Sequence, residues 1–91
     1  SGKIAEQMGN IMQEMAGNNR QVISITHLPQ IAARGENHYK VYKEETTNGT
    51  VSNMIMLSEE ERVQEIAQML SGSDITEAAV NNARDLLNKM P

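Results

Sequence analysis

The side chain best suited to chemistry in this 91-residue sequence is His27, which follows the short apolar run of residues 21–26. An imidazole can donate a hydrogen bond to a phosphate oxygen or orient a water molecule. If residues 21–26 form a strand of an open α/β sheet, His27 lies just past its carboxyl end, where such sheets bind ligands. A helix start follows, and helix N-terminal N–H groups favour anions. Position alone assigns no role, because a lone loop histidine is usually a polar surface residue.

Few other residues offer chemistry. The chain has no Cys, which excludes thiol nucleophiles, disulfides and Cys-based zinc sites. No second His, Asp or Glu stands at i, i+4 spacing from His27, and no metal site is predicted. Glu59, Glu60 and Glu61 fall at a helix start, where the helix dipole explains acidic residues. His38 is interpreted as a solvated strand residue without a function.

Charge and composition narrow the class of protein. The net charge is −4, with 12 acidic and 8 basic residues and no dense basic run, which argues against a direct grip on DNA. Arg34, Lys40 and Lys43 are interpreted as scattered, solvated charges. No apolar stretch approaches the roughly 20 residues that span a bilayer. With no Phe or Trp and seven Met, part of the apolar surface is expected to belong to a larger assembly.

The first half of the chain predicts a helix and then a strand. Apolar residues recur at helical spacing before the stop signal of residues 17–19: Ile4, Met8, Ile11, Met12 and Met15. Core packing is the favoured interpretation of the methionines among them, Met8, Met12 and Met15. Residues 21–26 contain Val22, Ile23 and Ile25 and predict a parallel strand buried on both faces. A short helix with Pro29 in its first turn follows.

The second half predicts a hairpin and two helices. Residues 38–57 contain Asn48-Gly49 between two strand patterns, a strong hairpin signal. Ser58 and Glu61 have the spacing of a capping box, and a final helix starts near residues 74–76. The fold class is therefore α/β, with one parallel-type strand, a β-hairpin and about four helices. One parallel strand cannot form a sheet alone, so its neighbours must come from elsewhere.

Four segments resemble RecN, a bacterial ATPase family of the ABC and structural-maintenance-of-chromosomes type. Residues 22–33, V-I-S-I-T-H-L-P-Q-I-A-A, resemble its switch-histidine segment, and residues 1–5 resemble the end of its D-loop. Residues 60–72, E-E-R-V-Q-E-I-A-Q-M-L-S-G, resemble the family's E-E-R-V-x-E-L-A-x-M-L-x-G stretch. Residues 75–78 and 83–87 resemble its C-terminal helix. The whole of residues 1–91 is thus expected to be an incomplete C-terminal subdomain of a P-loop ATPase head, with its C-terminal helices in residues 58–90.

The resemblance implies specific roles. His27 would be the catalytic switch histidine that contacts the γ-phosphate of ATP and couples nucleotide state to head pairing. Ser1 and Gly2 would lie at the nucleotide between two heads. ATP and Mg²⁺ are expected in the intact parent, which would act in recombinational repair of double-strand breaks in the bacterial cytoplasm, at the nucleoid. The implied partners are the rest of the same head, a second head, and DNA through the parent, with no membrane.

The departures from the family pattern are equally specific. The sequence has no G-x-x-x-x-G-K-[ST] loop, no acidic pair after an apolar strand, no signature motif and no coiled coil. The chain alone is therefore expected to be inactive and to hold no cofactor. It starts at Ser1 in mid-pattern, which suggests a piece of a longer protein. The alternatives are the equivalent piece of another ABC-type head and a non-enzymatic α+β interaction domain. Unpaired strand edges lead us to expect self-association of the isolated piece by strand or helix exchange.

Overall fold

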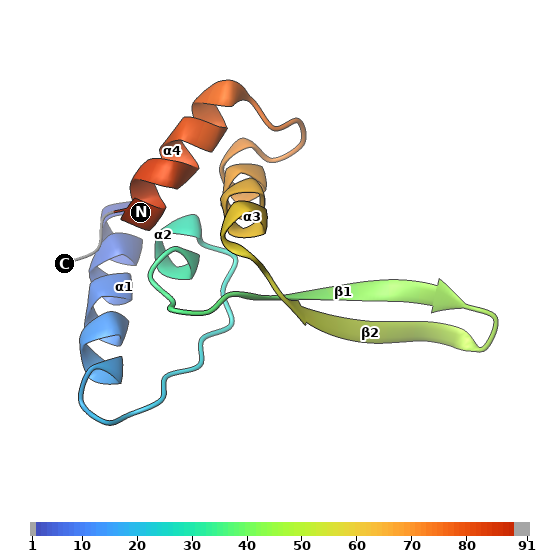
Figure 1. Cartoon of the computed structure of the whole chain (residues 1–91), viewed down its shortest axis with the longest axis horizontal. Coiled ribbons are helices and arrows are strands. Elements are labelled where there is room, and N and C mark those ends of the chain that lie inside the picture. The colour runs from blue at the N-terminus through green and yellow to red at the C-terminus, as the bar shows by residue number, and fades with distance from the viewer. Residues whose placement is uncertain (1, 89–91) are drawn as a thin grey trace.

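Four helices and one antiparallel hairpin make up the computed structural model, which describes residues 2–88 (Figure 1). The elements in chain order are α1 (Gly2–Ala16), α2 (Pro29–Ala32), β1 (Tyr39–Thr46), β2 (Gly49–Met56), α3 (Glu59–Ser71) and α4 (Glu77–Asn88). The α/β class, the four helices and the hairpin are as predicted. Within the described residues, no helix is long and apolar enough to cross a membrane.

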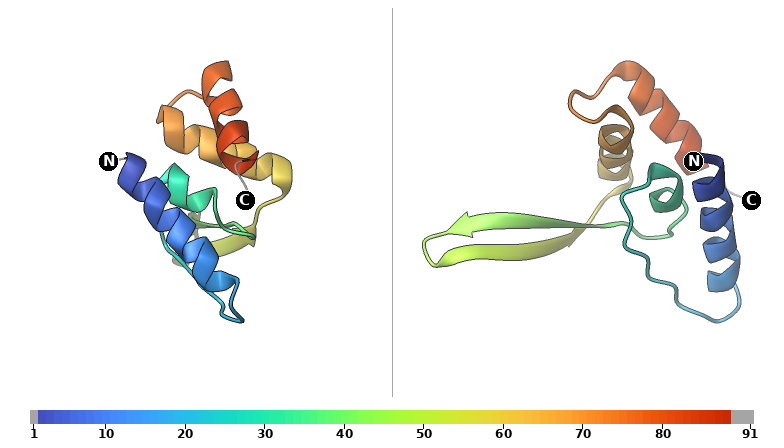
Figure 2. Two further views of the ribbon diagram at one scale, coloured as in Figure 1. Left: turned by 90° about the vertical axis from the view of Figure 1, so that its left-hand side faces the viewer. Right: turned by 180° about the vertical axis from the view of Figure 1, so that it is seen from behind.

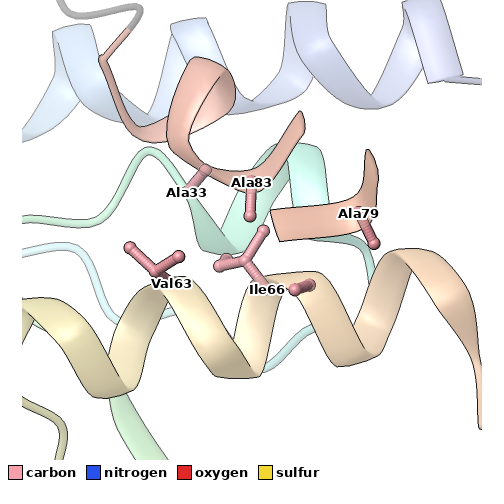
Figure 3. Close-up of a cluster of buried hydrophobic side chains, with 6 residues drawn as sticks. Ala33, Val63, Ile66, Ala79 and Ala83 are labelled. Carbon is pink, nitrogen blue, oxygen red and sulfur yellow. The ribbon is translucent and has the colours of Figure 1, made fainter. Parts of the chain in front are cut away.

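The core lies between α2, α3 and α4 (Figure 3). Ile66 is completely buried at its centre, and Val63 lies beside it on the same face of α3. Alanines fill the facing positions, which lets the helices approach closely: Ala33, Ala67, Ala79 and Ala83. The buried residues of α3 and α4 thus form one apolar stripe on each helix, and the two stripes face each other. A core so rich in alanine buries little area per residue, which leaves a chain of this size only marginally stable.

Local signals in the sequence set the ends of α3 and α4. The capping box is confirmed, because the Ser58 hydroxyl accepts from the Glu61 N–H at 3.2 Å and Glu61 Oε1 accepts from the Ser58 N–H at 2.9 Å. Gly72 ends α3 with a φ of 87°, a conformation that favours glycine. Thr76 caps α4 by accepting from the Ala79 N–H at 3.0 Å.

The hairpin projects from the helices as a separate arm (Figures 1 and 2). Its register runs from the pair Tyr39 and Met56 to the pair Thr46 and Gly49, with Gly49 at a φ of 115°. Almost every residue of both strands is exposed. The arm explains why the radius of gyration is 14.4 Å, against about 12 Å for a compact domain of this length. At its base, Lys40 Nζ lies 2.9 Å from Glu65 of α3.

The predicted parallel strand is wrong. Residues 21–26 have no regular secondary structure, and in the described part of the chain the only sheet is the pair β1–β2. Ile23 is 83% exposed and Ile25 fully exposed. The β-branched pattern was correctly recognised, but a strand exists only when a neighbour satisfies its backbone hydrogen bonds. Within residues 2–88 no such neighbour is present.

The favoured interpretation of the methionine-rich stripe of α1 as core is also wrong. The helix is present, yet Ile4, Met8, Ile11 and Met15 are all exposed, and Met12 is only partly buried. The helix instead turns its small residues inward, toward α2, and the larger apolar side chains face outward. Helical periodicity correctly identified an apolar face, but it did not say that the partner of this face lies within the chain.

Candidate functional site

His27 lies in a bend immediately before α2, and its side chain is exposed. The bend is stabilised locally, because the Thr26 hydroxyl accepts a hydrogen bond from the Leu28 N–H at 3.0 Å. This side-chain turn replaces a helix cap, since Leu28 stands at the N-cap position and its apolar side chain makes no capping bond. The imidazole is therefore presented to solvent on a constrained turn, where a ligand can reach it.

The start of α2 supplies fewer anion donors than the sequence led us to expect. The Leu28 N–H is already bound to Thr26, and Pro29 has no N–H. The N–H groups of Ile31 and Ala32 both donate to the Leu28 carbonyl, at 3.1 and 3.0 Å. With one turn of helix, the dipole at this end is also small. A phosphate at this position would depend on the imidazole and on groups from outside α2.

Small residues on one face of α1 bring that helix against α2. Ala5 and Gly9 are buried, and Gly9 faces the backbone of Gln30 and Ile31. A Cβ at Gly9 would stand 3.1 Å from the Gln30 carbonyl oxygen and 2.9 Å from Arg34 Cγ. The two helices therefore touch backbone to backbone, a contact that a larger residue would force apart.

The start of α1 reaches the segment that carries His27. A Cβ at Gly2 would stand 3.3 Å from the side-chain nitrogen of Gln30. Gly2 and His27, predicted as site residues from separate parts of the sequence, thus belong to segments that pack together through Gln30. Ser1, the other predicted cofactor contact, lies outside the described residues. No pattern in the sequence singled out Gln30.

A buried arginine that the sequence analysis did not single out holds the other end of α2. Arg62 of α3 is only 6% exposed, and its guanidinium donates to the carbonyls of Gly35 at 2.7 Å and Ala32 at 3.0 Å. Longer bonds reach the carbonyls of Ala33 and Glu36, both at 3.4 Å. Burial lowers the pKa of Arg62, although nearby Glu59 opposes the shift. The cation therefore neutralises the carbonyl end of α2.

The sequence contains a signal that could have identified Arg62. It stands four residues before Ile66 and next to Val63, so it lies at the edge of the buried stripe of α3. A charged residue at such a position is rarely buried unless it is paired or hydrogen-bonded. Here the partners are the carbonyls that follow a short helix.

The interpretation of Arg34 as a solvated charge is wrong. The residue is only 7% exposed, and its guanidinium donates to the Leu86 carbonyl at 3.4 Å, near the end of α4. Its side chain also passes Gly9 of α1. Arg34 therefore joins α1, α2 and α4, and together with Arg62 it fixes the helix that follows His27.

His38 is also not the solvated residue that the sequence suggested. It is partly buried at the base of the hairpin, and among the described residues its Nδ1 has no hydrogen-bond partner. Burial lowers the pKa of His38, with the nearby charges of Arg62 and Lys40 acting in the same direction and Glu65 opposing them. This imidazole lies at the junction of hairpin and helices, where its surroundings favour the neutral form.

Residues 2–88 place no three His, Asp or Glu side chains where they could hold a metal ion. A shallow hollow lies between α3 and α4, lined in part by Glu60 and Arg84, which form an exposed ion pair at 3.0 Å. His27 is not part of its lining. The turn before α2 remains the candidate site.

The chain is similar in sequence to part of a known group of proteins. No protein-family model matches it. It is 46% identical over 84 residues to DNA repair protein RecN of Deinococcus radiodurans, a match that covers 92% of this chain and 14% of that protein. Identity is 40% over 88 residues to RecN of Haemophilus influenzae and 38% over 87 residues to RecN of Vibrio cholerae. Each of these two matches covers 16% of the relative and at least 96% of this chain.

The chain is therefore homologous, over nearly its whole length, to a segment of DNA repair protein RecN. The resemblance on which the sequence analysis relied is confirmed, and the matches are consistent with a C-terminal piece of such a protein. The chain spans about one-sixth of the length of the relatives it matches.

Proposed function

We propose that this homologue of a RecN segment forms the C-terminal subdomain of an ATPase head, in which His27 contacts the γ-phosphate of ATP. The longer protein would act in recombinational repair of DNA double-strand breaks in the bacterial cytoplasm, with its heads working in pairs. The proposal rests on the homology and on the place of His27, exposed on a constrained turn. An imidazole there can hold a phosphate oxygen or a water molecule in line.

The observation that carries the proposal is the contact between Gly2 and Gln30. The resemblance assigns residues 1–5 and 22–33 to one nucleotide interface, although they are far apart in sequence. The structure packs these segments together, with a Cβ at Gly2 only 3.3 Å from Gln30. A contact between them is what a shared interface requires.

The chain's own groups fit one part of such a site. His27 can supply a hydrogen bond to phosphate, whereas no phosphate-binding loop or pair of Mg²⁺ carboxylates occurs in the sequence. The proposal therefore assigns the phosphate cradle and the Mg²⁺ ligands to the remainder of the longer protein. ATP would supply the phosphoryl group, and this chain would position one hydrogen bond beside it.

The exposed apolar side chains indicate where that remainder docks. Ile4, Met8 and Ile11 form an outward stripe on α1, and Ile23 and Ile25 are exposed in the segment leading to His27. Burying one such side chain contributes about 1.5–3 kcal/mol. Docking against the rest of the same head would cover both surfaces.

The test is the ATPase rate of a full-length RecN-type protein containing this segment, wild type against the His27→Ala substitution. We expect a loss of roughly 100-fold, the usual cost of removing one donor to developing charge. His38→Gln is the matched control, because it removes the chain's other imidazole at a position with no nucleotide role. Circular dichroism would verify folding. Unchanged turnover in a folded His27→Ala protein would overturn the assignment.

Two alternatives remain distinguishable. The equivalent piece of another ABC-type head is disfavoured by the identities to RecN proteins. A non-enzymatic interaction domain would fold independently and would leave ATP turnover insensitive to His27. The exposed isoleucines of residues 21–26 favour the head, because a free-standing domain has no reason to expose them.

A further inference from the structure

The two edges of the hairpin differ sharply in charge. Four of the eight residues of β1 are charged, namely Lys40, Lys43, Glu44 and Glu45. The strand β2 contains no charged residue. Charged side chains, lysine above all, are a usual protection of a strand edge against pairing with another chain. The β2 edge has no such protection, and from Thr50 to Met56 it contains no glycine or proline.

The register shows which backbone groups of β2 are free to pair. The Leu57 N–H donates to the His38 carbonyl at 2.8 Å, so these two residues form a hydrogen-bonded pair. Because such pairs alternate along an antiparallel ladder, Ile55, Asn53 and Val51 also turn their backbone groups toward β1. The residues between them direct their N–H and C=O groups outward, along the open edge: Thr50, Ser52, Met54 and Met56.

We propose that β2 pairs antiparallel with β2 of a second copy of this chain, with the two-fold axis at Asn53, forming a four-stranded sheet. This register overlaps all residues from Thr50 to Met56. It places Ser52 opposite Met54 and Thr50 opposite Met56 of the second copy, so every outward backbone group finds a partner. The proposed self-association through β2 does not depend on the role of His27.

The chemistry of the edge favours a second copy as its occupant. At the axis, Asn53 meets Asn53 of the second copy, and an amide both donates and accepts. On the same face, Val51 meets Ile55 of the second copy, a β-branched pair of the kind that stabilises cross-strand contacts. No charged residue of β2 is brought near its own copy.

The dimer would also relieve the instability of the arm. A two-stranded hairpin is marginally stable in water, and three or more strands with an apolar face are needed for independent stability. Tyr39, Val41, Met54 and Met56 share one face of the hairpin and are all exposed. Pairing through β2 places Ser52 and Thr50 of the second copy beside Met54 and Met56 on this face. It thereby surrounds Met54 and Met56 with neighbouring side chains.

A cysteine placed at the proposed axis provides the first test. The chain has no native cysteine, and the two copies of residue 53 would face each other as a non-hydrogen-bonded pair. Their Cα atoms would then be about 4.5 Å apart, within disulfide range. Asn53→Cys should form the disulfide dimer about a hundredfold faster than the control Asn48→Cys at the exposed turn, because pairing raises the effective thiol concentration.

Charge substitutions test the register. Val51→Lys alone or Ile55→Glu alone should weaken the dimer in sedimentation equilibrium, because each places a charged side chain opposite an apolar residue of the second copy. The double variant should restore it, since opposite charges at positions 51 and 55 would then meet across the interface. The hairpin itself tolerates both changes, because residue 51 faces Glu44 and residue 55 faces Lys40.

Three outcomes would overturn the proposal. The first is a chain that stays monomeric up to its solubility limit, which would leave the β2 edge to a strand from a longer protein. The second is equal disulfide rates for Asn53→Cys and Asn48→Cys. The third is a dimer that survives both single charge variants but is lost on Met8→Lys, which would place the interface on α1. None of these results changes the expected ATPase effect of His27→Ala.

Discussion

The helices α3 and α4 have amphipathic patterns similar to that of α1, but their apolar faces are buried whereas that of α1 is exposed. In α3 and α4 the apolar face packs inward, and Ile66 is completely buried. In α1 the large apolar side chains face solvent, and only Ala5 and Gly9 are buried. An amphipathic pattern thus indicates a partner surface without saying which polypeptide carries it. For α1 and the irregular residues 21–26, that surface is missing from residues 2–88.

The largest expected difference in stability is between substitutions of a buried isoleucine, Ile66, and of an exposed one, Ile25. Ile66→Ala should lower the free energy of unfolding by about 2–5 kcal/mol, because it opens a cavity in the core. Ile25→Ala should change it by less than about 0.5 kcal/mol, since the side chain is already in water. Urea denaturation of the chain measures both values, and the milder Ile66→Val serves if Ile66→Ala does not fold.

The same pair of substitutions in a full-length RecN-type protein separates the two regions further. There Ile25→Ala should become destabilising, as docking would bury that side chain, whereas the cost of Ile66→Ala should stay similar. Equal tolerance of Ile25→Ala in both contexts would contradict the proposed docking of residues 21–26.

A smaller loss is expected for two arginines of contrasting burial. Arg62→Met should cost about 2–3 kcal/mol, because it leaves the carbonyls after α2 without their charged donor. Arg84→Met should cost at most about 1 kcal/mol, since its ion pair with Glu60 is exposed. Thermal unfolding followed by circular dichroism distinguishes them. Similar losses from both variants would show that the bonds of Arg62 contribute no more than a surface ion pair.

The mildest expected change is a pH dependence at the base of the hairpin. Burial lowers the pKa of His38 in the folded chain below its ordinary value of 6.5. The unfolded chain therefore binds a proton more readily, and stability should fall as the pH drops below 6.5 toward the folded pKa. His38→Gln should flatten this part of the stability profile, measured as the urea midpoint between neutral and mildly acidic pH. A profile unchanged by His38→Gln would assign the effect to other groups.

Much of this fold was predictable from the sequence because the features concerned depend on interactions between residues close together in the chain. The capping box at Ser58 and Glu61 needs one turn of helix. The hairpin turn depends on a few neighbouring residues, and the hairpin appears as expected, although its turn is formed by Thr47 and Asn48 while Gly49 begins β2. The strand predicted at residues 21–26 failed for the opposite reason. Its hydrogen bonds must come from another segment, and no local pattern reports whether that segment is present.

The candidate site shows the same division. The position of His27 and the resemblance of its segment led to the prediction that it is a site residue, with Gly2 in the same expected interface, and both assignments stay predictions. The sequence did not identify Gln30, which connects the two segments, or Arg62, which holds the carbonyls after α2. Both residues act through tertiary contacts between helices. The spacing of residues along the chain does not show which side chain will contact a neighbouring helix.

The small-residue contact between α1 and α2 bears on local opening of the chain. On the α1 side it consists of Gly2, Ala5 and Gly9, so separating the helices exposes little additional apolar area from α1. Apolar burial contributes only about 25 cal/mol per Å², and the free energy of detaching α1 is correspondingly small. Local opening that detaches α1 while α3 and α4 stay folded is therefore expected to cost less free energy than unfolding of the core.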